Sequence, residues 1–365
     1  MDETGLAALA ALGFDAPTPI QEQSIAILLG GEDVVGLAQT GTGKTLAFGL
    51  PLAAAVNPSS PALQALVLVP TRELAKQVSE ALAHLSLFYH FSVVTLTGGT
   101  RVAGDIAKLR DGAQVMVGTP GRVIDHLKRG NLDLGSIRFA VLDEADEMLD
   151  IGFARDIDYI LRSVPKDRQT ALFSATMPES IRRLVWRYMR KAKEISVEPE
   201  RRTVENVRQF ICEVAVRDKT AALLHMHRTL DLGRSLVFRK MKISVDRLTT
   251  QLQNAGVSAR AIHGDLAQSE RDSVLAGFKA GEIQFLIATN VAARGLDIPD
   301  VEHVINFDVP QNAEEYIHRI GRTARAGKKG SAITFVGEWE LQEWDVIQRE
   351  VGGAEIEKME LPRRF

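Results

Sequence analysis

The sequence predicts an α/β protein of two tandem domains, each built on a mostly parallel sheet flanked by helices. Short apolar runs recur through both halves and alternate with segments of helical length, which is the rhythm of βαβ units. The 365 residues also exceed what one hydrophobic core usually organises. A polar, proline-bearing stretch near residue 200 interrupts the pattern. We therefore expect domains at residues 1–200 and 207–365, joined by a linker at 201–206.

The composition is typical of a soluble globular protein, with 45% apolar residues, 25% charged residues and a formal net charge of −3. No apolar run is long enough to span a membrane, so no membrane association is expected. The single cysteine, Cys212, excludes a disulfide framework, and the eight histidines form no metal-ligand cluster. These features favour a cytoplasmic protein. Because neither half is strongly basic, binding of nucleic acid would depend on local grooves.

The strand expected at residues 34–37 leads into a glycine-rich loop and then into a helix. The loop reads Ala38-Gln39-Thr40-Gly41-Thr42-Gly43-Lys44-Thr45. Such a loop turns backbone N–H groups inward around a phosphate, and the helix start adds unpaired donors. Lys44 would reach the outer phosphates, and the Thr45 hydroxyl would serve a phosphate-bound Mg²⁺. Ala38 stands where the usual P-loop pattern has glycine, and the alternative interpretation is a flexible Gly/Thr turn.

Further strands are expected at residues 65–69, 93–96, 115–118, 139–142 and 170–173. In the second half they are expected near 236–238, 258–262, 284–288, 303–307 and 332–336. Before the first strand we expect a helix at 4–12, an extended stretch at 17–21 held by two prolines, and a helix at 22–29. Ligands of an open parallel sheet bind at the carboxyl ends of its strands, so the residues after each run are the candidates for chemistry.

Carboxylates and an amide stand at informative positions of the first half. Asp143 and Glu144 directly follow the strand at 139–142, so that Asp143 can hold Mg²⁺ and Glu144 can orient and deprotonate an attacking water. The alternative is an acidic helix N-terminus favoured by the helix dipole. Gln21 carries an amide that can read the N6 and N7 edge of adenine, although a lone glutamine is more often a solvated surface residue.

Two groups of basic residues allow two interpretations. Arg322 and Arg325 are spaced i, i+3, which predicts one helix face where paired guanidiniums can engage phosphate oxygens. A solvated basic face is the commoner outcome of such spacing. We adopt that second interpretation for Arg182, Arg183, Arg187, Arg190, Lys191 and Lys193.

The chain resembles the DEAD-box ATP-dependent RNA helicases over nearly its whole length. The resemblance rests on motifs that occur in family order at residues 17–21, 38–45, 70–74, 98–99, 119–122, 143–146, 174–176, 268–271, 292–297 and 318–325. The family also has alanine at the position of Ala38, which agrees with a P-loop there.

The resemblance implies two RecA-like domains that close on ATP and RNA. ATP would be bound by Gln21, Thr40, Gly41, Thr42, Gly43, Lys44, Thr45 and Asp297, the last through the ribose. Mg²⁺ would be held at Thr45 and Asp143, largely through water. Catalysis would depend on Lys44, Asp143, Glu144 and the arginine fingers Arg322 and Arg325. Coupling between the domains would depend on Asp146, Ser174, Thr176 and His318, with His318 meeting Asp146 across the cleft.

RNA contacts are similarly implied at Arg72, Gly99, Thr119, Arg122, Gln268, Arg271 and Arg294. Contacts to phosphates and 2′-hydroxyls would give affinity for RNA without sequence preference, and clamping a bent strand would open a short duplex locally. The second hypothesis is an ATP-gated RNA clamp or assembly platform that does not separate strands. The third is a DNA helicase or translocase, against which the tetrad at 143–146 argues.

Three positions depart from the pattern of the family. Met241 stands near the place of a threonine that is common in the family and is associated with RNA contact. Asn290 replaces a frequent aspartate after Thr289. Thr4 occupies the place, seventeen residues before Gln21, of an aromatic side chain that stacks on adenine.

Overall fold

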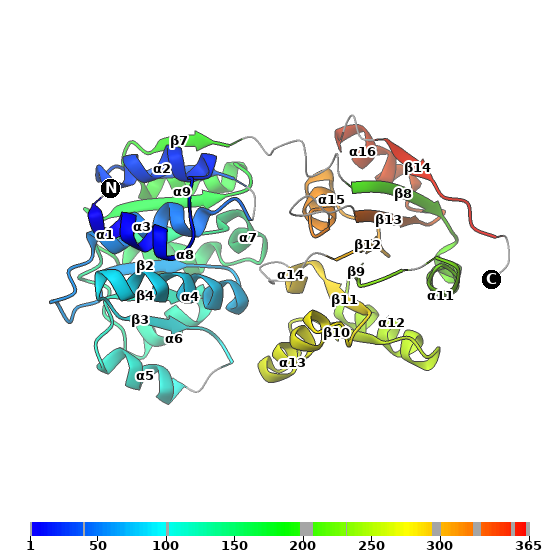
Figure 1. Ribbon diagram of the computed structural model, residues 1–365, viewed down its shortest axis with the longest axis horizontal. Coiled ribbons are helices and arrows are strands. Elements are labelled where there is room, and N and C mark those ends of the chain that lie inside the picture. Colours follow the sequence, from blue (N-terminus) through cyan, green and yellow to red (C-terminus); the bar gives the residue numbers. More distant parts are fainter. Residues whose placement is uncertain are drawn as a thin grey trace. The chain divides into compact units, whose positions relative to one another are not determined.

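The computed structural model describes residues 2–38, 41–99, 102–197, 207–230, 232–293, 301–323, 330–351 and 355–362. The chain divides into two compact units, Met1–Pro199 and Glu200–Phe365. Each unit contains a seven-stranded sheet whose described strand pairs are all parallel, with helices packed on the sheet (Figure 1). The predicted α/β class is confirmed. None of the helices in the described ranges has the length and apolar character needed to span a bilayer.

The first unit has the strand order β3-β4-β2-β5-β6-β1-β7. Its strands are β1 Val34–Leu37, β2 Ala65–Leu68, β3 Val93–Leu96, β4 Val115–Gly118, β5 Phe139–Leu142, β6 Gln169–Ser174 and β7 Lys193–Ser196. Its helices are α1 Glu3–Ala11, α2 Pro19–Leu29, α3 Lys44–Ala55, α4 Arg72–Tyr89, α5 Val102–Arg110, α6 Pro120–Lys128, α7 Ala145–Asp150, α8 Ala154–Arg162 and α9 Glu179–Tyr188. Because β5, β6 and β1 are neighbours, the loops after these three strands meet at one edge of the sheet.

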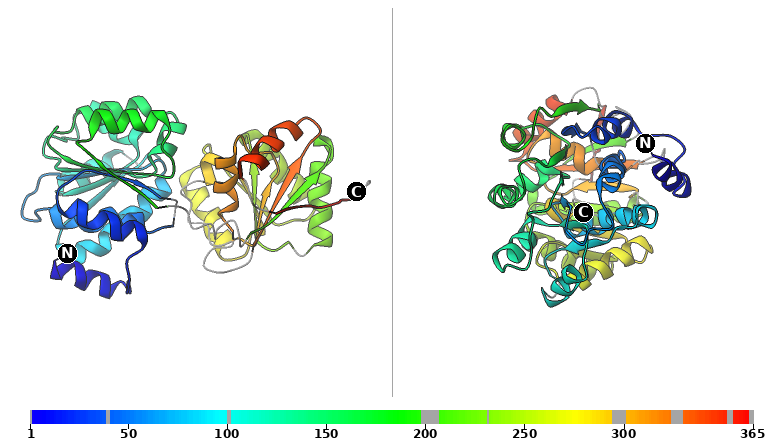
Figure 2. Two further views of the ribbon diagram at one scale, coloured as in Figure 1. Left: turned by 90° about the horizontal axis from the view of Figure 1, so that it is seen from above. Right: turned by 90° about the vertical axis from the view of Figure 1, so that its left-hand side faces the viewer.

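Two apolar cores hold the helices of the first unit on opposite faces of its sheet. Helices α1 to α4 contribute to one core, with Phe48, Val78 and Leu82 among its fully buried members. Helices α6 to α9 contribute to the other, where Val123, Ile157 and Ile181 are buried. Figure 2 shows the blue helices and the green helices on opposite sides of this sheet. Burial on both faces explains why the interior strands are nearly continuous apolar runs.

The second unit repeats this plan with the strand order β10-β11-β9-β12-β13-β8-β14. Its strands are β8 Val207–Glu213, β9 Ser235–Arg239, β10 Ala259–Ile262, β11 Phe285–Thr289, β12 His303–Asn306, β13 Gly330–Val336 and β14 Ile356–Lys358. Its α-helices are α11 Lys219–Thr229, α12 Lys242–Asn254, α13 Gln268–Lys279, α14 Asn290–Ala293, α15 Ala313–Ile320 and α16 Leu341–Val351, and a 3₁₀ turn spans Val216–Asp218. The neighbouring strands β11, β9 and β12 bring residues 290, 239 and 308 to one edge.

The structure contains strands that apolar runs did not indicate, namely β7, β8 and β14. In β7 only Ile195 is buried, and in β14 no residue is fully buried. These two strands lie at the edges of their sheets and pack on one neighbour, so they carry little apolar signal. Strand β8 lies inside its sheet, but only Val207, Gln209 and Cys212 of its residues are buried, so it too carries little apolar signal. The other strands agree with the expected ranges to within two residues.

The expectation of an extended stretch at 17–21 is wrong for its second half, because α2 begins at Pro19. Proline is favoured at the first helical position. Its fixed φ suits the helix, and a backbone N–H at this position would have no acceptor within the helix. The Gln21 side chain accepts a hydrogen bond from the Thr18 backbone N–H at 2.9 Å, which closes the first turn. Gln21 is therefore helical and points back toward the helix start.

Met241 occupies the N-cap position of α12, with φ −124° and ψ 145°, and supplies no capping hydrogen bond. A threonine hydroxyl at this position could accept from the backbone N–H groups of the first turn. Met241 thus leaves the first turn of α12 without a side-chain cap. Since the Met241 side chain is mostly exposed, the methionine gains little burial in exchange.

We predict that Met241→Thr raises the free energy of unfolding by roughly 0.5–2 kcal/mol, because the hydroxyl caps α12. Urea unfolding of the full chain measures the difference. Met241→Ala is the matched control, since it removes the same side chain without adding an acceptor. Equal stability of the threonine and alanine variants would contradict the assignment of the cap.

Candidate nucleotide and RNA sites

The glycine-rich loop lies between β1 and α3, as the sequence predicts. Gly41 and Gly43 have φ of 84° and 89°, in the left-handed region that side chains other than glycine rarely adopt. A Cβ at Gly43 would also lie 2.5 Å from Gln21 Nε2. Both the backbone conformation and the close approach of Gln21 therefore require glycine at position 43. Thr40 lies outside the described residues.

Lys44, the first residue of α3, is 6% exposed. Its ammonium donates to the Ala38 carbonyl at 3.1 Å and lies 3.8 Å from Asp143 Oδ1. A buried ammonium needs such oxygen partners, because burial without them is costly. Thr42 and Thr45, on either side of this residue, are half-buried. The lysine is thus held at the loop where an anion would bind.

Gln21 fixes the conformation of the same loop. Its amide is 5% exposed, and Nε2 donates to the Gly43 carbonyl at 3.0 Å. With Oε1 bonded to the Thr18 N–H, the amide keeps one donor hydrogen and one acceptor position. Gln21 is therefore not the solvated surface residue that a lone glutamine commonly is. It connects the first turn of α2 to the start of α3.

Asp143 and Glu144 lie at the carboxyl end of β5, buried at 2% and 6% exposure. Burial is the main cause that raises the pKa of Asp143 to about 6; Lys44 opposes the rise and the Glu144 charge adds to it. The Glu144 backbone N–H donates to Asp143 Oδ1 at 3.0 Å. The Glu144 carboxyl oxygen Oε2 is buried without a hydrogen-bond partner among the described residues. An unpartnered buried acceptor of this kind is suited to a water or a hydroxyl.

Glu144 also adopts a backbone conformation that is uncommon outside glycine, with φ 52° and ψ 52°. Such a conformation costs on the order of 1–3 kcal/mol and persists where the surroundings impose it. Here Glu144 is the N-cap residue of α7, between the end of β5 and the helix start. Glu144 is thus both the acidic residue at the helix start and the candidate base.

Asp146 joins α7 to the loop after β6. Its Oδ2 accepts from the backbone N–H of Ala175 and from both the N–H and the hydroxyl of Thr176, each at 3.0 Å. The Ser174 hydroxyl beside them is fully buried and has no partner among the described residues. The structure therefore brings Asp146, Ser174 and Thr176 together. His318 belongs to the second unit and is described there.

Candidate RNA residues of the first unit follow β2, β3 and β4. Arg72 begins α4, and its guanidinium packs on the turn at Gly98 and Gly99, where a Cβ on Gly99 would collide with it. Gly99 has φ 84°. Thr119 is the N-cap residue of α6, and Arg122 lies one turn further. These four residues share one edge of the sheet, because β3, β4 and β2 are neighbours.

Arg122 is held by a buried acid that the sequence did not single out. Its Nε donates to Asp105 Oδ2 at 2.8 Å, and His126 Nε2 lies 3.1 Å from the same oxygen. Asp105 and His126 are buried. The Asp105 side chain on α5 thereby fixes the guanidinium on α6. Spacing alone could not reveal this contact, since seventeen residues separate the pair.

In the second unit, Gln268 and Arg271 lie in the first turn of α13. The Gln268 amide donates to Asp272 Oδ1 at 3.1 Å, and Arg271 is buried. Arg294, Asp297 and Arg325 lie outside the described residues. The first turn of α13 therefore supplies the RNA candidates that the structure describes in this unit.

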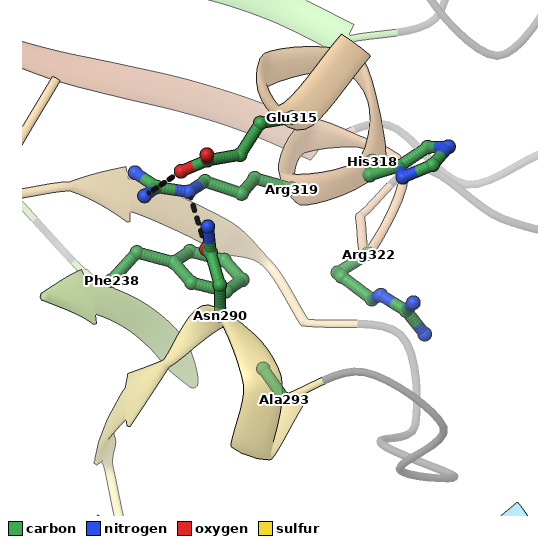
Figure 3. A pocket seen from close by; sticks show the side chains of 7 residues that line it. All are labelled: Phe238, Asn290, Ala293, Glu315, His318, Arg319 and Arg322. Carbon is green, nitrogen blue, oxygen red and sulfur yellow. Dashed lines mark hydrogen bonds and ion pairs between the residues drawn. The ribbon is translucent and has the colours of Figure 1, made fainter. Parts of the chain in front are cut away.

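A pocket in the second unit is lined by Phe238, Asn290, Ala293, Glu315, His318, Arg319 and Arg322. Figure 3 shows the Arg319 guanidinium between Glu315 and Asn290, while His318 and Arg322 point away from that contact. Arg322 and His318 thus share one pocket.

The expectation that Arg322 lies on a helix face is wrong. Helix α15 ends at Ile320, with Gly321 as its C-cap residue, so Arg322 lies in the turn beyond it. The next residue, Thr323, forms a β-bridge with Val301. This bridge pulls the chain out of the helical path.

Arg319 is the residue of this segment that spacing did not assign. It is 2% exposed, and its guanidinium donates to Asn290 Oδ1 at 2.7 Å, Asn306 Oδ1 at 3.1 Å and the Asp308 carbonyl at 2.9 Å. Glu315 Oε1 forms an ion pair with it, and the Phe238 ring lies 4.9 Å beneath it. Arg319 thereby joins β9, α14, β12 and α15. Arginine spacing alone could not reveal that Arg319 is the residue that makes these contacts.

We predict that Glu144→Gly is more stable than Glu144→Ala by about 1 kcal/mol, because glycine adopts a positive φ without strain. Both variants lose the same carboxylate, so their difference reports the backbone. At an ordinary helical position the order reverses, since glycine is about 1 kcal/mol worse than alanine there. Thermal unfolding of the two variants checks the prediction, and a more stable alanine variant would contradict the strained backbone.

Comparison with known proteins identifies the family. A DEAD/DEAH box helicase model matches residues 18–184, and a helicase conserved C-terminal domain model matches residues 218–327. The DEAD-box ATP-dependent RNA helicase CshA of Geobacillus kaustophilus is 48% identical over 345 residues, which are 94% of this chain and 73% of that protein. CshA of Bacillus subtilis is 48% identical over 325 residues, which are 89% of this chain and 66% of that protein.

Solved structures of similar proteins belong to the same family. The structure described as S. cerevisiae Dbp5 bound to RNA and ADP BeF3 is 33% identical with a TM-score of 0.86, covering 98% of this chain and 94% of that one. The structure of Mss116p bound to ssRNA and AMP-PNP is 29% identical with a TM-score of 0.85, and the match covers 99% of this chain and 78% of that one. The two units of this chain are RecA-like domains in tandem. The chain belongs to the DEAD-box family of ATP-dependent RNA helicases, which are ATP-hydrolysing enzymes.

Proposed function

We propose that this chain is an RNA-stimulated ATPase that couples ATP binding and hydrolysis to RNA clamping and to local unwinding of short RNA duplexes. The observation that carries the proposal is the buried group at the carboxyl ends of β1 and β5. There the Lys44 ammonium and the Asp143 carboxylate lie 3.8 Å apart, and Glu144 Oε2 has no partner in the described ranges. Cation, carboxylate and candidate base are the groups that phosphoryl transfer to water requires.

The proposed nucleotide site combines the loop with the residues that hold it. It comprises Gln21, Thr40, Gly41, Thr42, Gly43, Lys44 and Thr45, with Asp297 toward the ribose. The positive φ of Gly41 and Gly43 and the N-terminus of α3 support phosphate binding, since both expose backbone N–H groups. Because Gln21 also holds Gly43, base recognition and loop conformation depend on one amide.

The residues present fit a Mg²⁺ ion that binds together with the nucleotide. Mg²⁺ prefers oxygen ligands, and the Asp143 carboxylate and Thr45 hydroxyl supply two. No group of three His, Cys, Asp or Glu side chains that could hold a metal occurs within the described ranges. Phosphate and water oxygens would complete the ligand set. When bound, the ion would neutralise charge on the phosphates.

The proposed chemistry assigns Glu144 as the general base. Its carboxylate would orient and deprotonate the attacking water, while Lys44 binds the outer phosphates. Arg322 and Arg325 would stabilise the developing charge as arginine fingers. The position of Arg322 supports this role. It lies in the turn after α15, and its side chain points away from the contact of Arg319 with Glu315 and Asn290 (Figure 3).

Coupling between nucleotide and RNA is proposed to pass through Asp146, Ser174, Thr176 and His318. The three hydrogen bonds between Asp146 and residues 175–176 support it, because movement of α7 would then move that loop. The proposed RNA contacts are Arg72, Gly99, Thr119, Arg122, Gln268, Arg271 and Arg294. Two family structures of high similarity are described as bound to RNA. We also propose a cytoplasmic location, which rests on the single buried cysteine.

Strand separation distinguishes the helicase from a clamp that only binds. We expect the chain with ATP to separate a short RNA duplex while it hydrolyses ATP. RNA-stimulated hydrolysis without separation of the duplex would favour the ATP-gated clamp, and equal action on a DNA duplex would favour a DNA helicase.

We predict that Glu144→Gln retains ATP and RNA binding but lowers turnover by at least about 100-fold, because the general base is lost while Asp143 and Thr45 stay. Steady-state ATP hydrolysis with saturating RNA measures the effect. The control is Glu80→Gln, which makes the same change at an exposed carboxylate on α4. Turnover that survives in Glu144→Gln would contradict the assignment of the base.

We predict that Arg322→Ala lowers hydrolysis by roughly 10³-fold or more and leaves ATP binding without RNA nearly unchanged. The reason is that the glycine-rich loop and Asp297 bind the nucleotide in this proposal, whereas the Arg322 guanidinium acts on the transferring phosphate. Titration with a fluorescent ATP analogue and a turnover assay separate the two effects. Arg217→Ala, at an exposed arginine of the same unit, is the control. A parallel loss of binding and turnover would contradict this role.

A further inference from the structure

Helix α9 presents a tryptophan to solvent on its basic face. Ile181 is buried in the core of the first unit, while Arg182, Arg183 and Trp186 are exposed. Trp186 is 87% exposed and follows the two arginines by four and three residues. Residues three and four apart are neighbours on a helix, so Trp186 lies between them one turn further along. The basic group expected to be a solvated face therefore contains an exposed aromatic side chain.

Helix α8 repeats this arrangement. Arg155, Tyr159 and Arg162 are exposed and follow one another at i, i+4 and i+7, on one face. Tyr159 is 46% exposed. Ile157 and Ile160 on the other side of the helix are buried. Each of two helices thus carries an aromatic side chain flanked by arginines.

The two helices are neighbours, because one acid joins them. Asp158 on α8 accepts from Arg162 at 2.9 Å and from Arg187 of α9 at 2.6 Å. The Tyr188 hydroxyl also donates to the Asp158 carbonyl at 3.3 Å. We call the exposed residues of this surface the basic–aromatic face: Arg155, Tyr159, Arg162, Arg182, Arg183 and Trp186.

Most of the positive charge on the basic–aromatic face is uncompensated. Asp158 pairs with Arg162 and Arg187, whereas Arg155, Arg182 and Arg183 form no ion pair with any residue of the described ranges. The other acids on these helices are Asp156 and Glu179. This local excess of arginine contrasts with the net charge of −3 of the whole chain. The face is therefore a local site of attraction for anions.

The exposure of Trp186 and Tyr159 has no explanation in the packing of the fold. Tryptophan side chains are highly buried on average. One exposed aromatic side chain by itself would still need no explanation. Two on adjacent helices, each with arginines one turn away, form a pattern. Flat aromatic side chains interleaved with cations bind single-stranded nucleic acid, because bases stack on the rings and phosphates meet the cations.

We propose that the basic–aromatic face is a second site for single-stranded RNA. Bases stack on Trp186 and Tyr159, and phosphates contact Arg155, Arg182 and Arg183. An acidic peptide fits less well, because its apolar side chains would need a groove. The rings here have charged neighbours one turn away. The inference rests on the proposed function for the identity of the polymer.

The face shares no residue with the RNA contacts proposed above, which in the first unit lie at the starts of α4 and α6 and in the turn after β3. A strand that engages both sites gains affinity through linkage, because binding at the second site becomes intramolecular. A strand too short to reach both gains nothing. The length dependence of binding therefore isolates the contribution of this face.

The first experiment compares uridine homopolymers of roughly 6 and roughly 30 nucleotides by fluorescence anisotropy. The double variant Trp186→Ala with Tyr159→Ala should bind the long strand at least about fivefold more weakly and the short strand as tightly as the parent. Trp339→Ala is the matched control, since Trp339 is 84% exposed but lies between Glu338 and Glu340. It should bind both strands like the parent.

The second experiment tests the arginines through salt dependence. The double variant Arg182→Glu with Arg183→Glu should reduce the slope of log affinity against log salt by about 1.4 for the long strand, the contribution of two phosphates. Arg228→Glu with Arg247→Glu reverses two exposed arginines of the second unit and should leave the slope unchanged.

Unchanged long-strand affinity and salt slope would overturn the proposal and leave a solvated basic face. Binding of polyglutamate that depends on Arg182 and Arg183, with RNA binding unaffected, would also overturn it in favour of an acidic protein partner. Hydrolysis stimulated by the short strand should be equal in parent and variants. Absence of that stimulation in the parent would contradict the proposed function, and long-strand binding would still test the face.

Discussion

Burial of the Asp143 carboxyl group beside the Lys44 ammonium is the constraint on which the site of the first unit depends. The rise in the pKa of Asp143 shows that the cost of burial exceeds the attraction of a cation 3.8 Å away. The fold therefore holds this carboxylate at a thermodynamic cost. The strained backbone of Glu144 adds to that cost. The apolar strands β5, β6 and β1, buried on both faces, supply the stability that keeps these groups in place.

One well-bonded charged side chain organises the loops of each unit. Asp146 gathers the N–H groups of residues 175 and 176, and Arg319 gathers the oxygens of Asn290, Asn306 and Asp308. A buried charge is tolerated when its hydrogen bonds are satisfied. Because each side chain contacts several elements, it fixes their relative positions. Neither needs to contact a ligand to do so.

Sequence reasoning located the strands that are apolar runs and the loops after them, because such runs follow from burial on both faces. It missed β7 and β14, where an edge strand buries little, and β8, in which only Val207, Gln209 and Cys212 are buried. It placed Gln21 in an extended stretch, although Pro19 can begin a helix as readily as it can prevent one. It placed Arg322 on a helix that ends two residues earlier. Spacing describes a regular helix and carries no information on long-range contacts such as Asp105 with Arg122.

A long-range contact also explains why asparagine is tolerated at position 290. The contact that matters there is an oxygen that accepts from Arg319 Nε at 2.7 Å, which an amide provides as well as a carboxylate does. Glu315 already supplies the negative charge that balances the buried guanidinium. An aspartate would place a second negative charge beside the Arg319 guanidinium. Asn290 keeps the geometry that joins α14 to α15 and leaves the Arg319 pair neutral, so the departure changes the charge of the pocket and preserves its structure.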